Sequence, residues 1–133
     1  MNLSAFVRFH ARRTPDRLAL VFGGERVSYG ALDDRIGRLA GWLAANGVQP
    51  GAVVAAFMKN SAAFIELAFA ASHLGAIFLP INYRLARDEV AYILGNAEAA
   101  LLLADNCSGE LDAPGSRNRL WIGSGTWHFE RRP

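Results

Sequence analysis

The sequence has few of the residues that bind metals or form disulfides. Its 133 residues include a single cysteine, Cys107, which excludes an intramolecular disulfide and any multi-cysteine zinc or iron–sulfur site. The three histidines fall in separate stretches, with no carboxylate or cysteine at metal-ligand spacing: His10, His73 and His128. We therefore expect no metal site, and a reducing, cytoplasmic compartment fits the composition best.

Lysine and long hydrophobic runs are also scarce. Lys59 is the only lysine, so any chemistry that needs an amine has one candidate. The 14 basic and 12 acidic side chains leave a formal net charge of +2, spread along the chain, which does not favour nucleic acid as a partner. The nearly uncharged stretch 61–83 contains Glu66 and Pro80, among other interruptions, and is too broken for a membrane span. It is typical of buried core.

What the sequence does have is hydrophobic patterning, with 52% hydrophobic residues. Helical spacing near the N-terminus, over residues 3–11, predicts a surface helix that ends at Thr14-Pro15-Asp16. Two short apolar runs around Gly23-Gly24 predict a β-hairpin. A longer amphipathic helix follows, with Ser28 as its N-terminal cap and Gly47 as its left-handed C-terminal cap.

From residue 53 onward, buried strands alternate with helices. Continuous apolar runs predict strands at 53–58, 76–81 and 100–104, with helices at 62–74 and 88–95. Parallel strands joined by helices require right-handed crossovers. The sequence therefore predicts an α/β fold, a doubly wound and mostly parallel sheet with flanking helices, whose ligand crevice lies at the carboxyl ends of the strands.

The periodicity disappears after Asp105. We expect a division into a unit over residues 1–105 and an irregular tail over 106–133, in which only Leu120-Trp121-Ile122 could form a short strand. Such a unit leaves the edge of its third strand open, which natural domains usually cover.

Candidate site residues are few. Lys59 follows a predicted strand at its carboxyl end, where ligands bind in this architecture, although a solvated lysine is the commoner role. Neither a dinucleotide fingerprint nor a Walker-type loop accompanies it. Cys107 has no partner histidine nearby, and His10 and His73 are interpreted as packing residues. The acidic pairs fit helix starts, where the helix dipole favours negative charge: Asp33-Asp34 and Asp88-Glu89.

Five segments in series carry a family resemblance: Thr14–Leu20, Val27–Asp33, Leu43–Val54, Asn60–Phe64 with Ala70–Ala76, and Leu79–Leu85. In their order they resemble the beginning of the adenylate-forming (AMP-binding) enzymes, most closely the fatty or aryl acyl-CoA ligases. The resemblance implies an incomplete portion of the large N-terminal domain of such a ligase.

The resemblance also implies a chemistry. The family uses ATP and Mg²⁺ to activate a small carboxylic acid as an acyl-adenylate, then transfers the acyl group to coenzyme A. Arg84 resembles a position near the phosphates of coenzyme A in some acyl-CoA ligases; the alternative is a solvated loop arginine. The 133 residues contain no Ser/Thr-Gly-rich loop ending in Pro-Lys-Gly. Ser124-Gly125-Thr126 echoes such a loop, but Trp127-His128-Phe129 follows it, so we interpret the echo as chance.

Three hypotheses follow. The first is an N-terminal piece of an acyl-CoA ligase, shortened by a frameshift, a premature stop or the choice of boundaries, which retains no cofactor and no catalytic residue by itself. The second is a non-catalytic α/β binding module that acts on a partner chain through its open edge and apolar helix. The third is a self-contained α/β domain that resembles the ligases in structure only. Self-association through exposed apolar surface is compatible with the first two.

Overall fold

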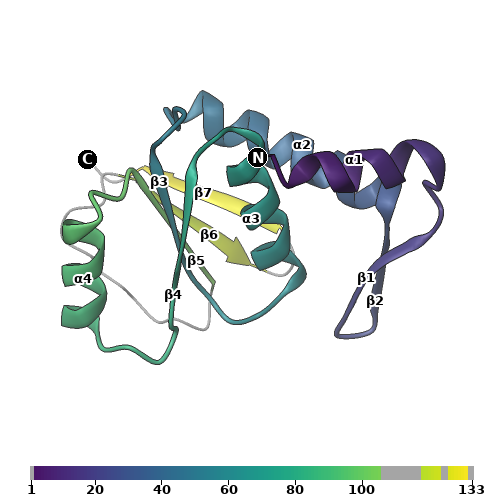
Figure 1. Ribbon diagram of the computed structural model, residues 1–133. Helices are drawn as coiled ribbons and strands as arrows, with labels where there is room; N and C mark the ends of the chain where they lie inside the picture. Colours follow the sequence, from purple (N-terminus) through teal and green to yellow (C-terminus); the bar gives the residue numbers. More distant parts are fainter. Residues whose placement is uncertain (1, 106–117, 124–125, 132–133) are drawn as a thin grey trace.

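The computed structural model describes residues 2–105, 118–123 and 126–131 of the chain (Figure 1). Its elements, in chain order, are α1 (Ser4–Arg13), β1 (Leu18–Phe22), β2 (Glu25–Ser28), α2 (Tyr29–Ala45), β3 (Val53–Phe57), α3 (Ala62–His73), β4 (Ile77–Ile81), α4 (Arg87–Asn96), β5 (Leu101–Asp105), β6 (Asn118–Gly123) and β7 (Thr126–Arg131).

The main sheet has the strand order β4-β3-β5-β6-β7. Strand β3 pairs in parallel with both neighbours, Val53 opposite Ile77 of β4 and Val54 opposite Leu101 of β5. Strand β6 extends the parallel part, and only β7 runs antiparallel. The predicted α/β fold with a mostly parallel sheet and flanking helices is therefore confirmed.

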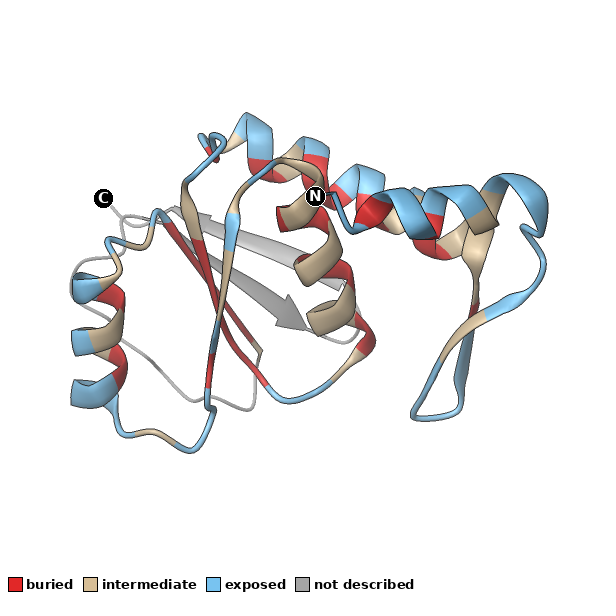
Figure 2. Ribbon diagram, in the orientation of Figure 1, coloured by how far each residue is buried: buried red, intermediate tan, exposed pale blue. Residues whose placement is uncertain are grey.

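Side chains of β3 point alternately to two buried faces. Val54, Ala56 and Met58 join the core cluster beneath α2 and α3, whereas Ala55 and Phe57 join a second cluster beneath α4. Figure 2 shows the buried residues concentrated on the strands and on the sheet-facing sides of the helices. Burial on both faces explains why the strand reads as a continuous apolar run in the sequence.

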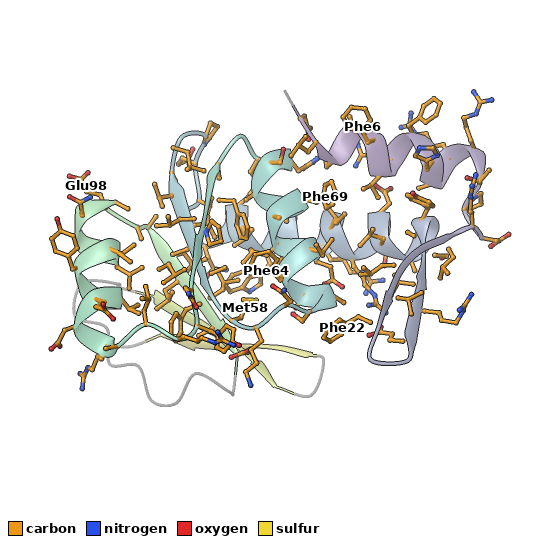
Figure 3. All side chains as sticks on the ribbon, turned by 60° about the horizontal axis from the view of Figure 1, so that its bottom comes forward. Phe6, Phe22, Met58, Phe64, Phe69 and Glu98 are labelled. Atoms are coloured by element: carbon orange, nitrogen blue, oxygen red, sulfur yellow. The ribbon has the colours of Figure 1, made fainter. Side chains whose placement is uncertain are left out.

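Helix α3 is apolar nearly all round because it is covered on more than one side. Leu67, Ala70 and Ala71 are fully buried. Phe64 and Phe69 pack against the same core cluster as Met58, and Figure 3 shows both rings on this helix above the strands. The prediction that this stretch forms buried core agrees with the contacts of α3 with the sheet and with α2.

The predicted caps of α2 are confirmed, and α3 begins at a serine cap of the same kind. Ser28 Oγ accepts the backbone N–H of Ala31 at 3.2 Å at the start of α2, and Ser61 Oγ accepts that of Phe64 at 3.2 Å at the start of α3. Gly47 follows α2 with a φ of 89°, in the left-handed region where an L side chain is strained. The residues that start and stop these helices are therefore visible in the sequence.

The hairpin is also as predicted. Strands β1 and β2 form a separate antiparallel sheet, with Phe22 opposite Glu25. Gly23 and Gly24 have φ values of 55° and 81°, which suits the tight turn of a two-residue hairpin. Apolar side chains at its tip and on α1 are exposed, and Phe6 points away from the body of the protein (Figure 3).

The structure differs from the sequence prediction after Asp105. Where we expected an irregular tail, the described residues form β6, which contains the predicted short strand at Leu120-Trp121-Ile122, and β7, which was not predicted. Because β6 pairs with β5, the edge of β5 is not open, and that expectation was wrong. The division of the chain at residue 105 stays a prediction. Within the described residues, no helix is both long and apolar enough to cross a membrane.

Candidate functional site

The site with the clearest topology lies at the carboxyl ends of β3 and β4. These strands end in register, with Phe57 opposite Ile81. The chain then leaves β3 for α3 on one face of the sheet and leaves β4 for α4 on the other. Two neighbouring strands whose connections diverge in this way leave a crevice between them, which is where ligands bind in open α/β sheets.

Lys59, Tyr83 and Arg84, here called the carboxyl-edge cluster, occupy this position. Lys59 Nζ lies 5.6 Å from the centroid of the Tyr83 ring, and Arg84 Cζ lies 5.4 Å from the same centroid. All three side chains are exposed. Among the described residues, neither Lys59 nor Arg84 forms an ion pair. Two positive charges therefore share one aromatic ring without a neutralising carboxylate in contact with their side chains.

Two side chains fix the loops that carry the cluster. Asp105 Oδ2 accepts the backbone N–H of Lys59 at 2.9 Å, which joins the end of β5 to the loop after β3. Asn82 Oδ1 accepts the backbone N–H of Arg84 at 3.0 Å, the geometry of an Asx turn. The backbone beneath the two cations is therefore held in place by hydrogen bonds from neighbouring strand ends.

The chemistry of the carboxyl-edge cluster is that of an anion site. Arg84 offers a planar fork of donors that suits phosphate, and Lys59 offers a compact ammonium on a flexible stem. The cluster contains no histidine and no carboxylate side chain. Its two cations can bind and orient a phosphate-bearing ligand.

An open groove lies next to this cluster along α4. It is lined by Leu85, Asp88, Glu89, Tyr92 and Ile93. Its charged groups are carboxylates, so it does not extend the positive surface of the cluster. Glu89 also accepts the backbone N–H of Ala86 at 2.8 Å, which is the capping role that the sequence predicted for this acidic pair.

A serine and a histidine meet elsewhere in the fold. Ser4 Oγ lies 3.0 Å from His73 Nδ1 and 2.7 Å from Asn2 Oδ1. Because an amide oxygen only accepts, the Ser4 hydroxyl donates to Asn2 and must accept from the Nδ1–H of His73. The histidine therefore does not act as a base toward this serine. With Leu3 N donating to Ser72 Oγ at 2.9 Å, the contacts tie α1 to the end of α3.

His10 and the first acidic pair also have structural partners. The His10 ring lies 4.9 Å from the Tyr29 ring, between α1 and the start of α2. Asp33 faces Arg8 at 3.7 Å, so α1 and α2 are also linked by charge. The His10 contact agrees with the packing role that the sequence predicts. The helix-start role predicted for Asp33-Asp34 is wrong, because α2 begins at Tyr29 and has no acidic residue in its first turn. Both carboxylates pair with arginines instead.

One charged network was not predicted from the sequence. Arg35 of α2 lies 2.8 Å from Glu25 of β2 and 3.3 Å from Glu66 of α3, and Glu66 is only 6% exposed. The hydrogen bond to Glu25 is the largest of the effects that raise the pKa of Arg35 above its ordinary value. The network joins the hairpin, α2 and α3, and its position between packed elements indicates a structural role.

The remaining predicted candidates lie outside the described side chains. Cys107 and the segment 124–125 are not among the described residues, and His128 lies in β7, whose side chains are not described. In the part of the chain that the structure describes, no group of three histidine, cysteine, aspartate or glutamate side chains could hold a metal ion.

Fold and topology together define a doubly wound α/β protein with two exposed cations, Lys59 and Arg84, at the carboxyl ends of β3 and β4. Residues 7–121 match the family described as AMP-binding enzyme, so the chain belongs to that family. The predicted resemblance to the adenylate-forming enzymes is confirmed. Enzymes of this family use ATP and coenzyme A.

Several relatives in the family are CoA ligases or CoA synthases. The chain is 39% identical over 93 residues to a feruloyl-CoA synthase of Amycolatopsis sp, covering 70% of this chain and 19% of that protein. It is 32% identical over 103 residues to a 3-oxocholest-4-en-26-oate–CoA ligase of Rhodococcus rhodochrous, covering 77% and 19%. A solved fatty acyl CoA synthetase of Mycobacterium tuberculosis superposes with a TM-score of 0.83 at 32% identity, covering 92% of this chain and 26% of that one. The chain thus spans about a fifth of the length of the curated relatives.

Proposed function

We propose that the chain is part of the N-terminal domain of an acyl-CoA ligase. The parent activity is the ATP- and Mg²⁺-dependent activation of a fatty or aryl carboxylic acid to an acyl-adenylate, followed by acyl transfer to coenzyme A. The family match over residues 7–121 supports this proposal, together with relatives whose names specify CoA ligases or synthases. The cytoplasm fits the cofactors of such an enzyme and the single cysteine of this chain.

Arg84 is the residue through which this chain contributes to the proposed function. It lies in the loop after β4, is exposed, and donates its backbone N–H to Asn82 Oδ1. We assign to it a contact with a phosphate group of coenzyme A. A single charged contact of this kind gives weak binding, with a Kd of about 1 mM, so the chain retains no coenzyme through purification.

A titration with coenzyme A tests the Arg84 assignment. We expect the amide signals of Tyr83 and Arg84 in a heteronuclear NMR spectrum to shift with coenzyme A, and Arg84→Gln to weaken the apparent affinity about tenfold. The matched control is Arg38→Gln, because Arg38 is an exposed arginine on α2 that is paired with Asp34. Equal affinity of the Arg84 and Arg38 variants would refute the assignment.

We also propose that these 133 residues do not catalyse adenylation by themselves. They contain no glycine-rich loop ending in Pro-Lys-Gly to hold the phosphates of ATP. The test is ATP–pyrophosphate exchange with a panel that includes ferulic acid, benzoic acid and a long-chain fatty acid. The expected result is exchange at the level of a blank without protein, and exchange above that blank with any acid contradicts the proposal.

Self-association belongs to the same proposal, because apolar side chains are exposed on several elements. Phe6 of α1 is 62% exposed, Val21 of the hairpin 53% and Tyr92 of α4 72%. Exposed apolar groups of this size favour association. We expect the mass-average molecular weight measured by light scattering to rise with protein concentration, and a constant value for the monomer would refute self-association.

A further inference from the structure

The carboxyl-edge cluster contains two cations where the proposed phosphate contact requires one. Lys59 comes from the loop after β3, and Arg84 from the loop after β4. Both lie against Tyr83, at 5.6 Å and 5.4 Å from its ring centroid. Like charges repel, so two cations at one ring are stabilised when an anion lies between or across them.

We propose that Lys59 is a second anion-binding residue and that Tyr83 positions it beside Arg84, so that the cluster selects ligands with phosphate groups on two different ribose oxygens. This inference rests on the proposed function, since the nucleotide end of coenzyme A carries phosphate at both its 3′ and 5′ oxygens. Arg84 takes one phosphate group through its donor fork, and Lys59 takes the other through its ammonium.

The ring of Tyr83 is what makes the two charges act together. A solvated lysine samples many rotamers, and ordering its side chain costs entropy that a bound anion must offset. The electron-rich face of Tyr83 attracts the ammonium to one region before any ligand arrives. The Lys59 side chain is therefore already partly ordered before a ligand binds.

The backbone supports the same arrangement. The bond from Lys59 N–H to Asp105 fixes the loop after β3, and the bond from Arg84 N–H to Asn82 fixes the loop after β4. The loop of Lys59 is thus tied to the end of β5 by the Asp105 carboxylate, and the loop of Arg84 is fixed by a local turn at Asn82.

The test compares two probes with the full chain at low ionic strength: adenosine 3′,5′-bisphosphate and adenosine 5′-monophosphate, titrated by NMR. The wild-type chain is expected to prefer the bisphosphate about tenfold, the gain from one additional charged contact. Lys59→Met keeps the aliphatic stem and removes the charge, so this variant should bind the two probes with about equal affinity while still binding the monophosphate. Lys59→Arg keeps the charge and should retain the preference for the bisphosphate.

Variants of Tyr83 separate positioning from simple surface charge. Tyr83→Phe keeps the aromatic face and should retain the preference, whereas Tyr83→Leu removes the face and should weaken bisphosphate binding about threefold at unchanged unfolding temperature. A preference that survives Lys59→Met, or a Tyr83→Leu chain that binds like wild type, overturns the inference.

The outcomes also distinguish this inference from the proposed function. If Arg84→Gln abolishes binding of both probes while Lys59→Met leaves the preference intact, the phosphate contact of Arg84 stands and the role of Lys59 is wrong. If Arg84→Gln changes neither probe, the Arg84 assignment itself fails. If the wild-type chain binds neither probe at millimolar concentration, both are overturned.

Discussion

One face of the parallel sheet packs against α2 and α3, whereas the other packs against α4. Among the described residues, the first face carries a cluster of 15 buried side chains and the second a cluster of 6. The carboxyl-edge cluster lies where the two faces meet, because Lys59 leads into α3 and Arg84 leads toward α4. One loop of the site is therefore held by a large core and the other by a small one.

The helix ends show the same difference. Helices α2 and α3 begin at serines that cap them and end at glycines, Gly47 and Gly75, with φ values of 89° and 69°. Helix α4 begins at Ala86, which has no side-chain cap, and is followed by Glu98 with a φ of 52°. The chain thus encodes two well-terminated helices and one weakly terminated helix beside the site, and α4 should open more readily than α3.

Core truncation has the largest expected effect. Leu67→Ala on α3, at a fully buried position in the large cluster, should lower the free energy of unfolding by about 3 kcal/mol. Leu94→Ala on α4 should cost less, about 2 kcal/mol, because the small cluster borders an open groove and can relax into the space. Urea unfolding followed by circular dichroism measures both. Equal losses would contradict the difference between the faces.

Much of this fold can be predicted from the sequence. Continuous apolar runs locate β3, β4 and β5, because strands buried on both faces have no polar alternation. The charge and serine patterns locate α2 and its cap at Ser28. Strand β7 was missed because Thr126–Arg131 has no continuous apolar run, although it alternates polar residues with Trp127 and Phe129, a pattern typical of a half-buried strand. In the structure the segment pairs with β6.

The candidate site was predictable only in part. Lys59 could be singled out because it follows a predicted strand at its carboxyl end, where ligands bind in this architecture. Arg84 could be singled out because its segment resembles that of acyl-CoA ligases. Their meeting at Tyr83 could not, since it depends on the register of β3 against β4 and on the rotamers of long side chains. The contact of the Asp105 carboxylate with the backbone of Lys59 could not be predicted either, because it depends on the pairing of β3 with β5.

The ion pairs of Arg35 give a second test of the difference between the two faces of the sheet, because they lie on the α2 and α3 face. Arg35→Gln leaves Glu66 buried without its guanidinium partner and should cost about 2 kcal/mol. The pKa of Arg35 is raised in the folded chain, so its stabilising effect is fully present below the ordinary arginine value and is lost only as the pH rises through the raised value. Arg35 therefore stays charged between about pH 6 and pH 9, so the stability lost in Arg35→Gln should not change through arginine titration in that range.

The measurement is urea unfolding of the wild type and Arg35→Gln at several pH values in that range, with Arg38→Gln as the control. Arg38 pairs with Asp34 on an exposed part of α2, so its loss should change stability by less than about 0.5 kcal/mol. If both variants lose the same stability, burial of Glu66 has no effect on the strength of the network.

Helices α3 and α4 differ in their N-terminal caps, so removing one cap and adding the other should each change the free energy of unfolding by about 1 kcal/mol. Ser61→Ala removes the cap of α3 and should destabilise the chain by that amount, whereas Ala86→Ser should stabilise it. Ala86 already has an extended backbone, with a φ of −70° and a ψ of 159°, and its N–H donates to Glu89, so a serine hydroxyl there completes a capping box. A loss of stability in the Ala86 variant would show that α4 is terminated in another way.

The smallest expected change is at the end of α4. Ala99 N–H donates to Leu94 O at 3.1 Å and Glu98 N–H to Gly95 O at 3.2 Å, the bonding pattern of a helix end that calls for a left-handed residue. Glu98→Gly should relieve the strain of its φ and raise the free energy of unfolding by about 0.5 kcal/mol, after the entropy that glycine gains in the unfolded chain is subtracted. Hydrogen exchange of the α4 amides should slow in this variant. Because α4 follows the loop of Arg84, a slower rate without any change in the affinity for adenosine 3′,5′-bisphosphate would show that the site does not depend on the opening of this helix.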